Sequence, residues 1–250
     1  MVYGIEKFKE YFKEYADQYV LIGGSACDII LNELGISFRA TKDLDMVLII
    51  ENMNEEFGAE IWKFIEDGKY NNRHKGFGKE QFYRFSHPEK PLFPKMIELF
   101  SRRNDKFTLH CYDNLTPIHI ENNIASLSAI LLSDAYYSLL LNGRVIVEGF
   151  SIIEIETNIL FKIKAWLDLK ENKRSGKAID SRNINKHKND IFRLIANIDP
   201  GKKVHLDFEI KQDVKKFTEM IYQDTPDLIN LGIKKTNLDV MISILRSIFL

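Results

Sequence analysis

The chain has 250 residues, enough for one large domain or two smaller ones, and its 45% hydrophobic and 28% charged content is that of an ordinary globular protein. A formal net charge of −1 excludes no class of partner, but it provides no overall basic field for nucleic acid. Two cysteines without metal-binding spacing, Cys27 and Cys111, and the lack of any apolar run near the roughly 20 residues of a membrane span predict a protein of the reducing cytoplasm with no membrane partner.

Apolar residues recur at helical spacing in some segments and form short apolar runs in others, which separates predicted helices from predicted strands. In the first half of the chain these patterns predict, in order, a helix at residues 5–16, a strand at 19–22, a helix at 25–35, a strand at 43–50, a helix at 54–68, and strands at 81–86, 95–101, 107–112 and 116–120. Ser25 and Asn54 are expected to cap their helices, because their side-chain oxygens can accept a backbone N–H at a helix start.

The second half of the chain has a mainly helical pattern. It predicts, in order, a helix at residues 133–142 capped by Ser133, a strand at 144–153, and helices at 154–171, 189–196, 208–222 and 237–249. Residues 170–188 are basic and contain few apolar side chains, so we expect a mobile linker there. The change in pattern predicts a mixed α/β domain at residues 1–130 and a mainly helical domain at residues 131–250.

Two acidic residues stand at the head of an apolar strand. Asp43 and Asp45 are separated by one leucine, and side chains at i and i+2 of a strand point to the same face. Two carboxylates so close repel each other unless a cation lies between them, and carboxylate oxygens are ligands for hard divalent cations. For this short motif alone, a solvated strand start would be the better interpretation. The residues that precede it favour a metal site.

A glycine-rich turn precedes those aspartates at the end of another apolar run. Gly23 and Gly24 let the backbone approach a phosphate, and a helix that starts beside them offers free N–H groups and a positive dipole end. The Ser25 hydroxyl can add a donor. Asp43 and Asp45 on the neighbouring strand would then hold Mg²⁺ against the phosphates of a nucleoside triphosphate.

A third carboxylate is expected on an adjacent strand, to complete the metal site or to accept a proton from the nucleophile. Glu98 is our candidate, because it is the acid of an otherwise apolar strand and a buried glutamate needs a partner. The alternative is that Glu98 lies on an outward face. Arg39 and Thr41, just before the aspartates, could reach a phosphate or could order the linker.

These residues resemble a known superfamily. The segment IGGSACDII followed by FRATKDLDMVL looks like the nucleotidyltransferases of the DNA polymerase β type, and in its fuller form is similar to the AbiEii/AbiGii-like group, which includes toxins of bacterial toxin–antitoxin and phage-defence systems. The resemblance implies an α/β core with a mixed sheet and flanking helices, two Mg²⁺ ions, and transfer of a nucleoside monophosphate with release of pyrophosphate. It implies that Gly24 and Ser25 contact the donor phosphates, and that Asp43, Asp45 and Glu98 take metal and general-base roles.

The same resemblance extends to the helical half. The group carries a lysine on one helix and an aspartate on a second, and the best matches here are Lys164 and Asp190. The group's pattern would place another acid where this chain has His187. Lys164 could bind a triphosphate, or its ammonium could simply reach solvent at the rim of a helix. The basic stretch at residues 170–188 would hold the backbone of an RNA acceptor, if RNA is the acceptor.

We therefore expect a nucleotidyltransferase that moves a nucleoside monophosphate from an NTP to a hydroxyl of RNA or protein, with a cognate antitoxin as a further expected partner if the protein is a toxin. Two alternatives stay open. One is a small-molecule adenylyltransferase of the antibiotic-modifying kind. The other is a catalytically silent nucleotide-binding or protein-binding module that keeps the fold.

Overall fold

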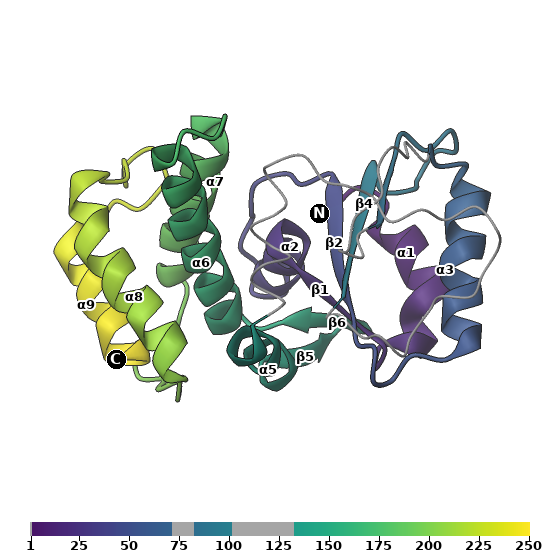
Figure 1. The fold of residues 1–250 in the computed structure, drawn as a ribbon, viewed down its shortest axis with the longest axis horizontal. Coiled ribbons are helices and arrows are strands. Elements are labelled where there is room, and N and C mark those ends of the chain that lie inside the picture. Colours follow the sequence, from purple (N-terminus) through teal and green to yellow (C-terminus); the bar gives the residue numbers. More distant parts are fainter. Residues whose placement is uncertain (1, 72–82, 102–132) are drawn as a thin grey trace. The chain divides into compact units, whose positions relative to one another are not determined.

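The computed structural model describes residues 2–71, 83–101 and 133–250, and Figure 1 shows their helices and strands coloured along the sequence. The chain divides into two units, one made of Met1–Glu121 and Arg144–Glu154 and the other of Asn122–Gly143 and Ile155–Leu250. Each unit is described by itself. The predicted boundary near residue 130 and the predicted strands at 107–112 and 116–120 lie outside the described residues.

The first unit is built on a mixed six-stranded sheet with the strand order β3-β4-β2-β1-β6-β5. Strand β1 pairs antiparallel with β2 and parallel with β6, and β2 pairs parallel with β4. The unit's elements, in chain order, are α1 (Ile5–Phe12), η1 (Lys13–Tyr15), β1 (Tyr19–Ile22), α2 (Gly23–Glu33), β2 (Asp43–Leu48), α3 (Glu55–Gly68), β3 (Tyr83–Ser86), β4 (Met96–Ser101), β5 (Arg144–Val147) and β6 (Phe150–Ile153). The fold class is therefore α/β, as the sequence predicts.

Helices α1 and α3 lie together beside this sheet, and α2 lies on the other side of β2 (Figure 1). The packing of α1 against β1 and α3 is aromatic: the ring centroids of Phe8 and Tyr19 are 5.3 Å apart at 90°, and those of Phe12 and Phe64 are 5.2 Å apart. Such edge-to-face ring pairs stabilise a core beyond the burial of their area. Asn54 caps α3 as predicted, because its side chain accepts the backbone N–H of Phe57 at 2.9 Å.

Residues 144–153 form two strands rather than the single predicted strand. Strands β5 and β6 pair antiparallel as a hairpin, with Val147 opposite Phe150. The two turn residues, Glu148 and Gly149, have φ values of 51° and 85°, the left-handed geometry that a tight hairpin turn requires. Strand β6 then runs parallel to β1, so this hairpin belongs to the sheet of the first unit although it follows a helix of the second.

The second unit is helical. Its elements are α5 (Asp134–Asn142), α6 (Ile155–Arg174), α7 (Ser181–Ile195), α8 (Phe208–Met220), η2 (Ile221–Gln223) and α9 (Leu238–Phe249). Trp166 of α6 is fully buried, and its ring lies 5.2 Å from that of Phe217 on α8. Ser133 stands at the start of α5 but does not cap it: its hydroxyl donates to Glu209 instead, at 2.8 Å.

The predicted linker at residues 170–188 is wrong for most of its length. Helix α6 continues to Arg174 and α7 begins at Ser181, so only residues 175–180 connect them. The Asp180 carboxylate accepts the backbone N–H of Arg182 and caps α7, while Ile179 and Ile184 are buried. The segment is therefore anchored by these two isoleucines and by Lys188, which is also buried.

Candidate active site

The glycine turn between β1 and α2 lies directly against Asp45. Ile22, the last residue of β1, is the register partner of Asp45 on β2. Gly23 has φ +67°, and a Cβ at that position would lie 2.6 Å from Asp45 Oδ2. A side chain at Gly23 would therefore be strained by the backbone and would also push the aspartate aside. Glycine here allows the first turn of a helix to approach a carboxylate closely.

Arg39 and Thr41 lie at the same turn. A Cβ on Gly24 would be 2.9 Å from Thr41 Oγ1 and 3.3 Å from Arg39 Nη2. Thr41 is buried, and the guanidinium of Arg39 lies over the ring of Phe38 at 5.4 Å. The structure thus brings a cation and a hydroxyl to the glycine-rich start of α2, where backbone N–H groups already favour an anion. Their assignment to phosphate binding stays a prediction.

Ser25 differs from expectation in its local role. Helix α2 begins at Gly23, with Ile22 at the N-cap position and no side-chain capping bond, so the predicted cap at Ser25 is wrong. The Ser25 hydroxyl is fully buried and donates to the carbonyl of Ile22 at 3.0 Å. The left-handed geometry at Gly23 starts the helix two residues early and leaves the serine inside its first turn. Ser25 can therefore offer its backbone N–H, whereas its hydroxyl is engaged.

The three predicted carboxylates meet on neighbouring strands. Asp43 and Asp45 are half-buried on β2, with buried Leu44 between them on the opposite face. Glu98 of β4 is the register partner of Asp45 and is 7% exposed. Burial, followed by the negative charges of Asp45 and Asp43, raises the pKa of Glu98 to about 7, although Arg84 opposes this. Glu98 is therefore an inward-facing acid beside both aspartates.

Sequence reasoning missed Arg84, which is the partner of Glu98. The antiparallel pairing of β3 and β4 places Arg84 opposite Glu98, and its Nε donates to Glu98 Oε1. The Glu98 side chain is 10% exposed and the Arg84 side chain 39%, so the pair lies at the edge of the buried region. The available signal was the arginine inside a short apolar strand, together with the requirement that a buried glutamate have a counter-charge.

The donor chemistry of this site fits a hard divalent cation only in part. Asp43 and Asp45 supply carboxylate oxygens on one face of β2. In the described part of the chain, however, no three His, Cys, Asp or Glu side chains are arranged so that they could hold a metal ion together. Glu98 Oε1 accepts from Arg84, so Glu98 could become a third ligand through that oxygen only by leaving the guanidinium.

Lys164 and Asp190 lie in the second unit, each with a different partner. Lys164 Nζ is 3.0 Å from Asp168 and 3.9 Å from Asp213; burial lowers the pKa of this lysine, but the two carboxylates outweigh it and raise the pKa above its usual value. Asp190 is fully buried and accepts from Lys162 at 3.0 Å. Both predicted residues therefore belong to ion pairs internal to the helical unit.

Comparison with known proteins gives fold-level likeness alone. No family model matches the chain, and no curated protein matches it. Among solved structures, an antigenic nucleotidyltransferase-like protein from Paracoccidioides brasiliensis is similar at 16% identity and a TM-score of 0.45, covering 96% of this chain and 97% of its own. JHP933 from Helicobacter pylori is similar at 15% identity and a TM-score of 0.43, covering 97% and 87%. No helix in the described ranges is long and apolar enough to cross a membrane.

Proposed function

We propose that the protein is a metal-dependent nucleotidyltransferase, which moves a nucleoside monophosphate from an NTP to an acceptor hydroxyl and releases pyrophosphate. The observation that carries this proposal is the contact of the Gly23 turn with Asp45, which puts the N-terminus of α2 beside a carboxylate pair. A helix start that favours phosphate and acids that favour Mg²⁺ are both needed to grip a triphosphate. Either feature alone would favour a plain turn or a solvated strand.

The proposed roles follow from the positions of the side chains. Backbone N–H groups at Gly24 and Ser25 would bind the donor phosphates, and Arg39 would add a positive charge beside them. Asp43 and Asp45 would hold Mg²⁺, which when bound neutralises phosphate charge and polarises the phosphoryl group.

Glu98, with a pKa of about 7, is suited to accept a proton from the attacking hydroxyl. We leave Lys164 and Asp190 out of this set, because carboxylates already surround the lysine and a buried lysine already pairs with the aspartate.

Transfer is tested by incubating the protein with each α-labelled NTP, Mg²⁺ and total cell extract. We expect label in RNA or protein, and loss of at least the bulk of that transfer in Asp43→Asn and Asp45→Asn. Label found only in small molecules would favour the antibiotic-modifying alternative. Far-ultraviolet circular dichroism checks that both variants stay folded. A transfer rate that is unchanged in both variants would refute the assignment of the carboxylate pair.

The toxin role has its own readout. If the acceptor is an essential RNA or protein, expression of the wild-type chain should arrest growth of its host cell, and expression of Asp45→Asn should not. Rescue by co-expression of a neighbouring gene would then identify a cognate antitoxin. Equal growth arrest by both forms would mean that toxicity, where present, does not come from transfer.

One observation favours a second candidate, a silent nucleotide-binding module. Glu98 Oε1 is hydrogen-bonded to Arg84, and the described residues contain no set of three His, Cys, Asp or Glu side chains arranged for a metal. Calorimetric titration with each NTP, with and without Mg²⁺, followed by an assay for pyrophosphate, separates the two candidates. Binding without pyrophosphate release favours the silent module. Faster release in Arg84→Ala than in the wild type would instead show that the guanidinium restrains an active site.

A further inference from the structure

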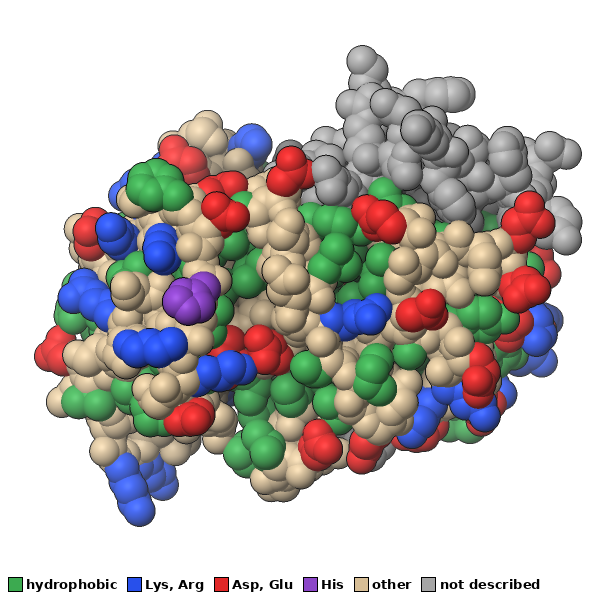
Figure 2. Space-filling model, turned by 90° about the horizontal axis from the view of Figure 1, so that it is seen from below, with side chains coloured by type: hydrophobic (Ala, Val, Ile, Leu, Met, Phe, Trp, Pro, Cys, Tyr) green, Lys and Arg blue, Asp and Glu red, His purple; other side chains and the backbone are tan. Residues whose placement is uncertain are grey.

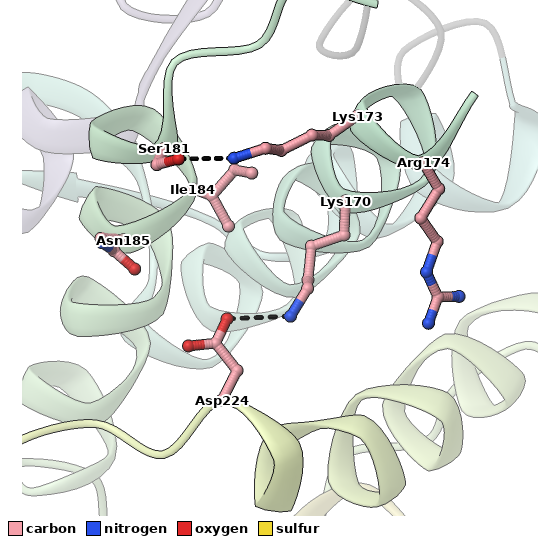
Figure 3. A pocket seen from close by; sticks show the side chains of 7 residues that line it. All are labelled: Lys170, Lys173, Arg174, Ser181, Ile184, Asn185 and Asp224. Atoms are coloured by element: carbon pink, nitrogen blue, oxygen red, sulfur yellow. Dashed lines mark hydrogen bonds and ion pairs between the residues drawn. The ribbon is translucent and has the colours of Figure 1, made fainter. Parts of the chain in front are cut away.

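The helical unit contains a pocket that the proposed transferase site does not use. Its volume is about 500 Å³, and it lies where the end of α6, the start of α7 and the residue after η2 meet (Figure 3). All but one of its lining residues are polar or charged; they are Lys170, Lys173, Arg174, Ser181, Ile184, Asn185 and Asp224. Three of these seven side chains are cations and one is an anion, so the charge of the lining is positive.

The single acid of the pocket is already neutralised. Lys170 Nζ lies 2.8 Å from Asp224 Oδ2, and Lys188, which is buried, donates to Asp224 Oδ1. Partial burial raises the pKa of Asp224, but the hydrogen bonds from both lysines outweigh it and hold that pKa below its usual value. The carboxylate is therefore ionised and shared between two ammonium groups, so it does not compensate the other two cations of the pocket. Outside the pocket, the Asp180 carboxylate attracts Lys173, but its hydrogen bonds go to Arg182.

Lys173 and Arg174 are those other cations. Lys173 Nζ donates to the neutral Ser181 hydroxyl at 2.5 Å, and Arg174 has no hydrogen-bond or ion-pair partner among the described residues. Figure 3 shows Lys170 and Arg174 extending from α6 in the same direction, as their i, i+4 spacing requires. Cations at a helix C-terminus are common because of the helix dipole. The dipole accounts for the two cations, but not for the pocket that they line together with Ser181 and Asn185.

These donors suit the phosphates of a nucleic-acid backbone. Figure 3 shows the Lys173 ammonium beside Ser181 and the Arg174 guanidinium on the other side of the pocket, so the two cations face separate phosphates. A guanidinium can bind two oxygens of one phosphate at once, and an ammonium with a hydroxyl beside it can donate to those of another. No aromatic side chain lines the pocket, since Trp166, whose ring lies 4.6 Å from Lys170 Nζ, is fully buried. A base would therefore find no ring to stack on, which favours a backbone phosphate over a free nucleotide.

The chain as a whole carries a formal net charge of −1, so the proposed contact is a local one. On the face shown in Figure 2, Lys and Arg are interspersed with Asp and Glu, so neither sign forms an extended field there. We propose that Lys173 and Arg174 at this pocket bind two neighbouring backbone phosphates of a single-stranded nucleic acid, independently of base sequence. The site would anchor an acceptor strand if the protein transfers nucleotides to RNA, but binding itself requires neither NTP nor Mg²⁺.

The test is direct binding of fluorescein-labelled oligouridine and oligoadenosine RNA to the full chain, measured by fluorescence anisotropy without NTP or Mg²⁺. Salt is varied from about 50 to about 200 mM, where phosphate contacts show as a falling affinity. Removing both cations in Lys173→Gln/Arg174→Gln should lower the slope of log affinity against log salt by about 1.4, which corresponds to ~25-fold weaker binding at 0.1 M salt.

The matched control is Lys177→Gln/Lys186→Gln, which removes the same charge from two exposed lysines outside the pocket. A loss confined to the pocket variant, with similar binding of both oligonucleotides, supports the proposal. An equal loss in the control overturns it, because the effect would then come from overall charge. Binding of ATP or inorganic phosphate without binding of either RNA also overturns it. Since no transfer is measured, an inactive transferase leaves this result unaffected.

Discussion

Ionisation of Glu98 should leave a clear mark on the free energy of unfolding. Burial and the charges of Asp45 and Asp43 raise its pKa from 4.5 to about 7 in the folded protein, against the attraction of Arg84. The folded state therefore binds a proton more tightly than the unfolded state. The cost of the carboxylate to stability is absent below the unfolded pKa, develops as the pH rises from 4.5 to about 7, and is complete above that window.

The magnitude follows from the two pKa values. Their separation corresponds to about 3 kcal/mol of unfolding free energy once Glu98 is fully ionised in both states. Most of this develops between about pH 5 and about pH 8. Glu98→Gln resembles the protonated acid at every pH, so its stability relative to the wild type should rise by that amount across the interval. Glu98→Gln also alters the hydrogen bond from Arg84. A change in unfolding free energy that is the same at both pH values cancels when the two pH values are compared.

Urea unfolding in the presence of EDTA, followed by circular dichroism at both pH values, measures the difference. Asp45→Asn is an informative second variant, because the Asp45 charge is one cause of the raised pKa of Glu98 and its removal should flatten the wild-type profile. Parallel pH profiles for the wild type and Glu98→Gln would refute the reasoning, since they would show that Glu98 ionises in the folded protein as it does in the unfolded chain.

Two further predictions concern the glycine turn and the buried ion pair. Gly23→Ala should lower the free energy of unfolding by more than Gly35→Ala, because both positions have positive φ at a cost of about 1–2 kcal/mol but only the first meets Asp45; equal losses in urea unfolding would contradict the contact. Asp190→Asn should destabilise by about 3–5 kcal/mol, because Lys162 would keep a buried charge without its 3.0 Å carboxylate partner. A thermal unfolding midpoint within error of the wild type would contradict that assignment.

Local patterns predicted the elements that carry the site. The strands at residues 19–22 and 43–50 and the helix start at Asn54 depend on apolar spacing and a single capping residue, both of which are read within one segment. The inward position of Glu98 followed from the same logic, since an acid in a continuous apolar strand has little solvent to face. These features depend on neighbours in sequence, which is why sequence reasoning reached them.

The features that it did not reach depend on pairing at a distance or on single backbone angles. The turn at Glu148 and Gly149 splits one apolar run into a hairpin, and the Gly23 geometry moves a helix start ahead of Ser25. The linker prediction failed because counting charges over residues 170–188 undervalued the buried isoleucines at 179 and 184. Hydrophobic periodicity gives no φ angle, so the hairpin turn and the early start of α2 could be seen only in the structure.

Arg84 shows most clearly why register matters for function. The residues next to Glu98 in the sequence do not identify Arg84 as its partner, because Arg84 lies on a separate strand that pairs antiparallel with β4. A guanidinium and a divalent cation neutralise the same carboxylate, and Glu98 cannot give the same oxygen to both at full strength. Arg84 on Oε1 therefore opposes a metal at that oxygen. If the transferase is active, NTP and Mg²⁺ together must displace Arg84 from Glu98, or Glu98 must act with the arginine in place, through Oε2 as a metal ligand or as a proton acceptor.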